Sequence, residues 1–145
     1  MDKLKLLVAE DDETTLSVYK KKALADTVFE TRFAENGREA LKEYNSWKPD
    51  IILLDIYMPV MTGFSVLKEI RGKIRDTSTA IIMVTSVAEK EDIAQCMHLG
   101  IQGYVVKPFD VRGFTGKILE YYEKINPEKA RVAMAELKKQ ILHEG

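Results

Sequence analysis

Four short aliphatic runs of the chain each end in side chains that can do polar chemistry. The run ends are Glu10–Glu13 after Leu4–Ala9, Asp55 after Ile51–Leu54, Thr85 with Ser86 after Ala80–Val84, and Lys107 after Tyr104–Val106. Runs this short and this rich in Ile, Val and Leu are typical of strands buried on both faces of a parallel sheet. Because ligands bind outside the carboxyl ends of such strands, we expect these polar groups to gather at one edge of the sheet.

Three carboxylates of this set, Glu10, Asp11 and Asp55, would repel one another at that edge. Like charges within about 4–6 Å destabilise the ionised forms. A divalent cation relieves the repulsion, and Mg²⁺ prefers oxygen ligands, takes one or two carboxylates and keeps several waters. The sequence therefore predicts a Mg²⁺ site at Glu10, Asp11 and Asp55 with coordination positions left for a ligand.

Asp55 stands alone at its strand end, next to the predicted cation. A carboxylate in that position can act as a nucleophile and form an aspartyl phosphate. The cation would neutralise the phosphoryl oxygens during transfer. Lys107 would supply a compact positive charge for another phosphoryl oxygen, and the Thr85 hydroxyl could donate a hydrogen bond to a third.

Each of these residues also has an ordinary structural interpretation when it is taken alone. Acidic residues such as Glu10–Glu13 favour the N-terminus of a helix, Asp55 and Thr85 can be caps or turn residues, and Lys107 can be a surface charge. These alternatives are independent of one another. The functional interpretation requires all four to reach one edge, and the pattern places them there, so we favour a single site.

Segments with helical spacing separate the aliphatic runs. A fifth, more mixed run, Val28–Ala34, lies between the first two of these segments, and the order is strand then helix five times over. This order predicts an α/β fold with a five-stranded parallel sheet, helices on both faces and right-handed crossovers.

The residues from Asp55 to Gly63 read D-x-x-M-P-x-M-x-G. Together with the acidic cluster, Thr85 and Lys107-Pro108-Phe109, this motif resembles the receiver domain of two-component response regulators. The gaps of 44 residues (11 to 55), 30 residues (55 to 85) and 22 residues (85 to 107) suit that family. The resemblance covers residues 1–125 and implies the flavodoxin-like, doubly wound form of the predicted sheet.

The resemblance also implies a role for each motif residue. Asp55 would be the phosphoacceptor, and Thr85 and Lys107 would hold the phosphoryl group. The Mg²⁺ ligands would be Glu10, Asp11, Asp55 and the main-chain carbonyl of Tyr57, with a share for Asp12 left open. Tyr104 would be a switch residue that follows Thr85, and the peptide bond before Pro108 would be cis.

The implied partners are a sensor histidine kinase or a histidine phosphotransfer protein, and a downstream effector protein or domain. The effector would read a surface formed by the fourth helix, the fifth strand and the fifth helix. The resemblance thus implies a cytoplasmic phosphorelay switch and not a conventional turnover enzyme. In the sequence, 22 Lys and Arg against 23 Asp and Glu give a net charge of −1, which argues against nucleic-acid binding. Aliphatic runs of about four residues argue against a membrane span.

Residues 126–145 are predicted to form an additional C-terminal helix over about Pro127–His143. Asn126-Pro127 is a typical helix start, and Ala130, Met134, Leu137 and Ile141 are spaced 4, 3 and 4. Two interpretations stay open for this seam. The helix packs on the body, or it pairs with a second copy of the chain or leads to an effector domain.

Three other functions compete with the signalling one. An aspartate-nucleophile phosphohydrolase would also use Mg²⁺, but it commonly needs a second aspartate two residues on, where this chain has Tyr57. A flavin carrier would need amides and hydroxyls where Glu10–Glu13 stand. A binding module that never becomes phosphorylated would keep the site unused.

Overall fold

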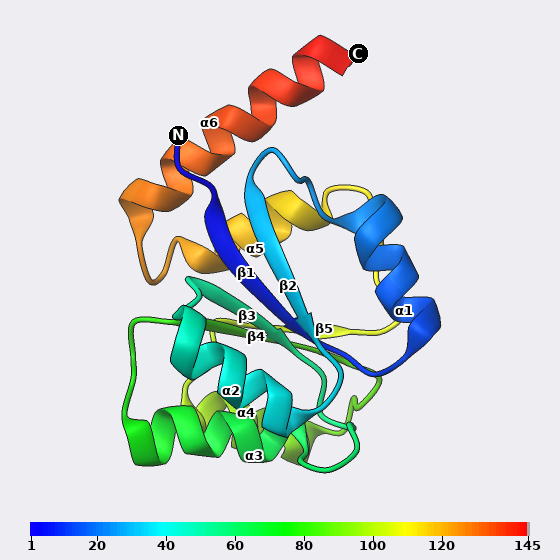
Figure 1. The fold of residues 1–145 in the computed structure, drawn as a ribbon, viewed down its shortest axis with the longest axis vertical. Coiled ribbons are helices and arrows are strands. Elements are labelled where there is room, and N and C mark those ends of the chain that lie inside the picture. The colour runs from blue at the N-terminus through cyan, green and yellow to red at the C-terminus, as the bar shows by residue number, and fades with distance from the viewer. Residues whose placement is uncertain (145) are drawn as a thin grey trace.

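The computed structural model describes residues 1–144, and its centre is a five-stranded parallel sheet (Figure 1). The strands are β1 (Leu4–Ala9), β2 (Phe29–Ala34), β3 (Ile51–Leu54), β4 (Ala80–Thr85) and β5 (Gly103–Val106). Their order across the sheet is β2-β1-β3-β4-β5. The predicted α/β fold and its five strands are confirmed.

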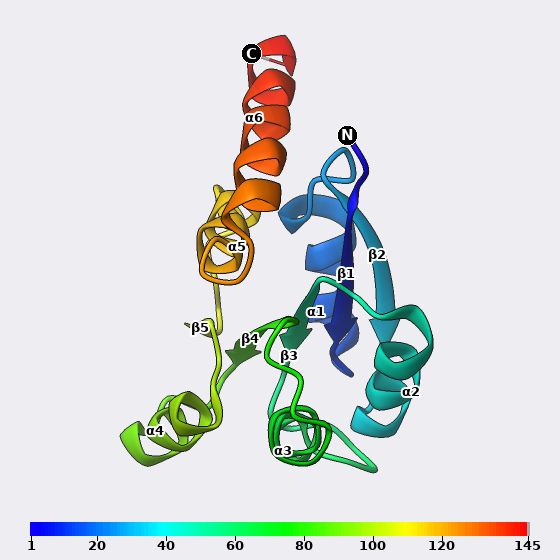
Figure 2. The same cartoon turned by 90° about the vertical axis from the view of Figure 1, so that its left-hand side faces the viewer.

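Helices cover both faces of the sheet because its strands are apolar on both sides (Figure 2). Alternate residues of β1 point to opposite faces, so Leu6 and Val8 join one core and Leu7 and Ala9 the other. The helices are α1 (Glu13–Val18), α2 (Gly37–Trp47), α3 (Gly63–Lys68), α4 (Lys90–Leu99), α5 (Phe114–Tyr122) and α6 (Pro127–Glu144). The cores place α1, α5 and α6 on one face and α2, α3 and α4 on the other. Both α1 and α3 continue as π-helical turns, over Tyr19–Ala23 and Glu69–Ile74.

Arg71 joins the end of the α3 segment to the neighbouring part of the fold. Its guanidinium donates hydrogen bonds to the carbonyl oxygens of Asp76, Thr79 and Gly100, each at 2.7 Å, and to Gln102 Oε1 at 3.0 Å. Gln102 Oε1 also accepts a hydrogen bond from the Ile81 amide at 2.8 Å. One planar cation thus fixes the start of β4 and the segment between α4 and β5.

The C-terminal helix α6 packs on the core as far as Leu137, and Gln140 still reaches the body because its Oε1 accepts a hydrogen bond from the Thr27 hydroxyl. Ala130 and Ala133 are buried, and Met134 and Leu137 pack against the same core. Ile141, the last residue of the predicted seam, is 60% exposed, so the seam packs on the body only as far as Leu137. The reason is length: α6 has 18 residues and α5, on which it lies, has 9, so the last turns of α6 extend past the body (Figures 1 and 2).

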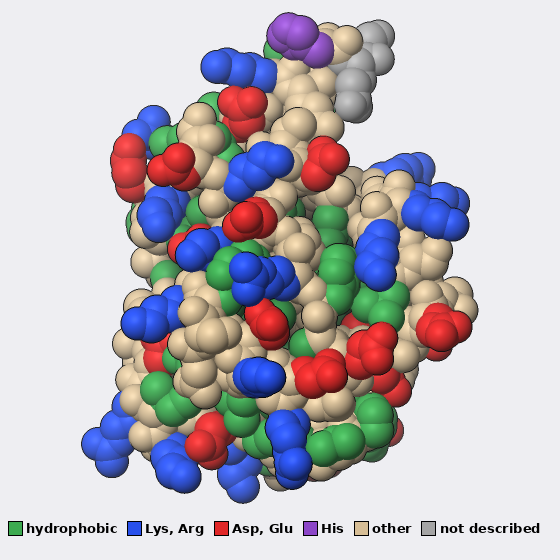
Figure 3. All heavy atoms as spheres, viewed as in Figure 1, with side chains coloured by type: hydrophobic (Ala, Val, Ile, Leu, Met, Phe, Trp, Pro, Cys, Tyr) green, Lys and Arg blue, Asp and Glu red, His purple; other side chains and the backbone are tan. Residues whose placement is uncertain are grey.

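Lys, Arg, Asp and Glu side chains are interspersed over the face shown in Figure 3. Within residues 1–144, none of the helices has the length and apolar character needed to cross a membrane. The division of the chain at residue 125 stays a prediction.

Candidate functional site

The sheet brings the predicted site residues together because their strands are in register. Ala9, the last residue of β1, pairs with Leu54, the last residue of β3. The next residues are therefore neighbours, and the Asp55 amide donates to the Ala9 carbonyl at 3.2 Å. The backbone of Glu10 is held by the neighbouring strand β2, because the Glu10 amide donates to the Ala34 carbonyl at 2.9 Å.

Gly63, the last residue of the D-x-x-M-P-x-M-x-G motif, closes the segment that follows Asp55. A Cβ atom at Gly63 would lie 1.8 Å from the Asp55 carbonyl oxygen, which only glycine avoids. Thr62 caps α3, because its hydroxyl accepts a hydrogen bond from the Ser65 amide at 3.2 Å. Asp55 therefore sits at the start of a tight connection into a well-defined helix.

Three carboxylates converge at this edge. One oxygen from each of Glu10, Asp11 and Asp55 lies within 4.8 Å of the others. Glu10 and Asp55 are buried, with 1% and 7% exposure, and Asp11 is exposed. The donor set is all oxygen, it is anionic and it is open to solvent on the Asp11 side, and these features fit a hard cation such as Mg²⁺.

Lys107 supplies the positive charge between the two buried carboxylates. Its Nζ atom lies 2.6 Å from Glu10 Oε2 and 2.8 Å from Asp55 Oδ2. Burial opposes the charge on Lys107, but the hydrogen bonds to Asp55 and Glu10 outweigh burial and raise the pKa of the ammonium group. For Glu10, burial disfavours the charged form and so raises the pKa of the carboxyl group. The hydrogen bond from Lys107 reduces this rise without cancelling it.

An aromatic stack supports the segment that carries Lys107. The Phe109 ring lies 4.3 Å from the Phe114 ring and 5.3 Å from the Tyr19 ring, centroid to centroid. The peptide bond between Lys107 and Pro108 is cis, as the resemblance implied. The role of this stack could not be inferred from the sequence, since Tyr19 and Phe109 are far apart along the chain.

Asp12 has a different task from the two acidic residues before it. Its carboxylate caps α1, accepting hydrogen bonds from the Thr15 amide at 2.9 Å and the Thr15 hydroxyl at 2.7 Å. These hydrogen bonds lower the pKa of Asp12. Among residues 1–144, the carboxylate cluster consists of Glu10, Asp11 and Asp55 and does not include Asp12.

Thr85 is the last residue of β4, and Tyr104 lies on the neighbouring strand β5, opposite Met83. Thr85 is fully buried, and its hydroxyl accepts from the Val87 amide at 3.4 Å. The Tyr104 hydroxyl donates to the Val87 carbonyl at 2.6 Å, and burial raises the pKa of Tyr104 to about 12. Val87 thus contacts both residues, a link that the sequence did not reveal.

The side chain of Tyr57 is 68% exposed, so it takes no part in the buried cluster. A metal role for the Tyr57 carbonyl stays a prediction. Two residues along, the amide of Met61 donates to the Pro59 carbonyl at 2.7 Å across Val60, whose φ is 70°. A β-branched residue with positive φ is a local outlier, and it lies in the loop directly after Asp55.

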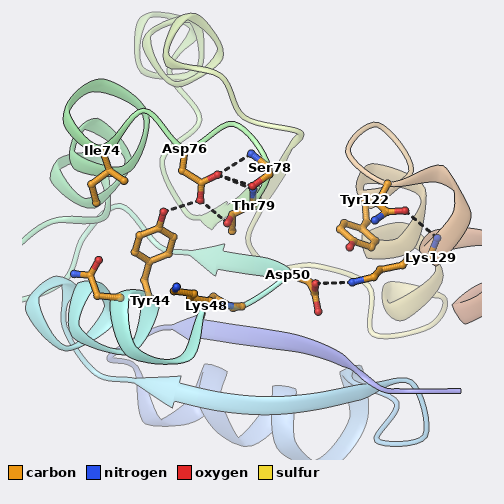
Figure 4. A pocket seen from close by; sticks show the side chains of 12 residues that line it. Tyr44, Lys48, Asp50, Ile74, Asp76, Ser78, Thr79, Tyr122 and Lys129 are labelled. Atoms are coloured by element: carbon orange, nitrogen blue, oxygen red, sulfur yellow. Dashed lines mark hydrogen bonds and ion pairs between the residues drawn. The ribbon is translucent and has the colours of Figure 1, made fainter.

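A hollow of about 490 Å³ lies at the opposite, amino end of the strands (Figure 4). At its centre, the Asp76 carboxylate accepts hydrogen bonds from the hydroxyls of Tyr44 and Thr79, each at 2.6 Å, and from the Ser78 amide at 2.7 Å. Burial acts to raise the pKa of Asp76, but these hydrogen bonds prevail and lower it. The network joins α2 to the segment just before β4, and none of the chemistry predicted from the sequence lies there.

Comparison with known proteins agrees with this geometry. The sequence pattern of the response regulator receiver domain matches residues 6–119. The chemotaxis protein CheY of Listeria monocytogenes is 37% identical over 122 residues, which cover 83% of this chain and 97% of that protein. The regulatory protein AtoC of Escherichia coli is 38% identical over 111 residues, and the match spans only 24% of AtoC.

Solved structures show the same fold. A CheY-like response regulator receiver domain from Methanospirillum hungatei superposes with a TM-score of 0.78 at 27% identity, covering 88% of this chain and 99% of that one. The chemotaxis response regulator CheY4 of Vibrio cholerae superposes with a TM-score of 0.73 at 29% identity, covering 83% and 99%.

The position of Lys107 leads to a prediction for the protein without divalent cations. Lys107→Met leaves Glu10 and Asp55 buried without a positive partner, so we expect the free energy of unfolding at pH 7 to fall by about 3 kcal/mol. Added Mg²⁺ should raise the thermal midpoint more in this variant than in the wild type. Lys117→Met, at an exposed position on α5, is the control and should change stability by less than about 0.5 kcal/mol. Equal stability of the two variants in urea titrations would contradict the electrostatic role of Lys107.

Proposed function

Because the chain belongs to the response regulator receiver domain family, we propose that it is a phosphorylation switch with Asp55 as its phosphoacceptor. Receiver domains are phosphoacceptor signalling domains and not conventional enzymes. The observation that carries the assignment of Asp55 is its surroundings: a buried carboxylate lies 2.8 Å from the Lys107 ammonium and beside Glu10 and Asp11. The other two carboxylates and the lysine are the groups that an aspartyl phosphate requires around it.

In the proposed reaction, a carboxylate oxygen of Asp55 attacks the phosphorus of a donor phosphohistidine. The new O–P bond forms as the P–N bond breaks, and the electron pair stays on the imidazole nitrogen, which then takes a proton from solvent. Lys107 turns from its ion pair with Asp55 to a phosphoryl oxygen, and the Thr85 hydroxyl donates to another. The donor is a sensor histidine kinase or a histidine phosphotransfer protein.

Glu10, Asp11, Asp55 and the Tyr57 carbonyl are the groups proposed to hold Mg²⁺. When bound, Mg²⁺ neutralises the phosphoryl oxygens as negative charge shifts during transfer. The three clustered carboxylate oxygens support this assignment, and the Asp12 cap on α1 supports Asp11 as the ligand of that pair.

The proposed readout runs through Val87, which contacts both Thr85 and Tyr104. When Thr85 turns to the phosphoryl group, its contact with the Val87 amide is lost, and the Tyr104 ring gains room to turn inward. This change biases two arrangements of the surface formed by α4, β5 and α5. Met97 and Val106, which are 64% and 42% exposed, give that surface apolar contact area for an effector protein or domain.

The first test is chemical. Incubation with acetyl phosphate and Mg²⁺ should add about 80 Da to the intact mass of the wild type, and Asp55→Asn should stay unmodified. Asp110→Asn, which changes an exposed aspartate in the loop after β5, is the control and should still gain the phosphoryl group. Modification of Asp55→Asn to the wild-type extent would show that another side chain accepts the phosphoryl group.

A second test separates two adjacent carboxylates. Asp11→Asn should weaken Mg²⁺ binding by about tenfold or more in calorimetric titrations, because it removes a ligand. Asp12→Asn removes the same charge one residue away but keeps a good helix cap, so it should weaken binding by less than about threefold. Equal losses in the two variants would mean that Asp12 shares the metal.

A further inference from the structure

The last described turns of α6 expose two large apolar side chains to solvent. Leu142 is 80% exposed, more than any other large hydrophobic residue among residues 1–144, and Ile141 is 60% exposed. Both lie beyond the end of the core that Ala130, Ala133 and their neighbours form against α5. An 18-residue helix is about 27 Å long, roughly twice the length of α5, so these two side chains extend past the support that α5 gives.

A groove of about 450 Å³ lies between α5 and α6 and leads along α6 toward Ile141 and Leu142. Its floor is apolar, from Leu119, Ala130, Met134 and Ala135. Because Lys138 lines the groove, Ile141 and Leu142, three and four residues further on, continue its line along the helix. Each chain therefore carries both an apolar groove and an apolar helix end aligned with it.

Charge along this face is divided between its two ends. Near the α5–α6 turn the groove carries Glu123, together with Glu128 and Arg131, which form an ion pair with each other at 2.5 Å. The opposite end carries Lys138, with Lys139 next to it, so among residues 1–144 Glu123 is the unneutralised charge at one end and the lysines are at the other. A parallel pair of helices would place the lysines of two copies together, whereas an antiparallel pair places the basic end of each copy on the acidic end of the other. The small side chain of Ala135, near the middle of α6, allows two helices to approach closely where they cross.

We propose that this face of α6 is a self-association surface, on which two copies pair antiparallel about a twofold axis near Ala135. Leu142 and Ile141 of each copy enter the groove of the other beside Glu123, and the same contact is made twice, as a twofold interface requires. The occupant is a second copy because the chain itself supplies both complementary halves. The net charge of −1 opposes the approach of two copies only weakly.

Sedimentation velocity of the full chain over about 10–500 µM, with and without beryllofluoride and Mg²⁺, tests the proposal. The wild type should form dimers as its concentration rises. Leu142→Glu should raise the dimer dissociation constant by about tenfold or more. Val132→Glu is the matched control, since Val132 is a 40% exposed apolar residue of α6 that does not line the groove. It should dimerise as the wild type does.

A charge exchange keeps the test independent of any loss of fold. Lys138→Glu and Glu123→Lys should each weaken dimerisation, and the double variant should regain it, with unchanged helical circular dichroism throughout. A wild type that stays monomeric over the whole range in both states would overturn the proposal. So would a dimer that Leu142→Glu leaves intact, or a double variant no better than the two single ones.

Discussion

The structure depends on one electrostatic constraint: the ammonium group of Lys107 lies between the buried carboxyl groups of Glu10 and Asp55, 2.6 Å from one and 2.8 Å from the other. Two buried carboxylates without a cation would repel each other and each would lose its hydration, a cost of several kcal/mol. The lysine offsets that cost while no other cation is bound. Because the ion pair can open, the same lysine is available to a phosphoryl oxygen.

The fold places these charges by means that tolerate little change. The register of β1 and β3 makes the residues after Ala9 and Leu54 neighbours. Gly63 lets the chain turn back against the Asp55 carbonyl, and the stacked ring of Phe109 supports the segment that starts at Lys107. The polar edge is thus built on strands that are buried on both faces. The favourable free energy of burying this large apolar core offsets the unfavourable free energy of bringing like charges together.

Much of the fold and the site could be predicted from the sequence because both rest on strong local patterns. Aliphatic runs give the strands, and the polar residue directly after each run must lie at the carboxyl edge of the sheet. The rest depends on tertiary contacts that no pattern carries. The sequence does not show that the Asp12 carboxylate caps α1, and the contacts of Val87 and Arg71 join segments far apart in sequence. Ile141 continues the spacing of the apolar seam, but the spacing does not show that α5 is too short to cover it.

A crystal structure of the protein with beryllofluoride and Mg²⁺ tests the central claim most directly. The account predicts beryllofluoride on a carboxylate oxygen of Asp55, the cation beside Glu10 and Asp11, and both the Lys107 ammonium and the Thr85 hydroxyl turned to the fluorine atoms. A structure in which Lys107 keeps its ion pair with an unmodified Asp55, while beryllofluoride or the cation binds elsewhere, would contradict it.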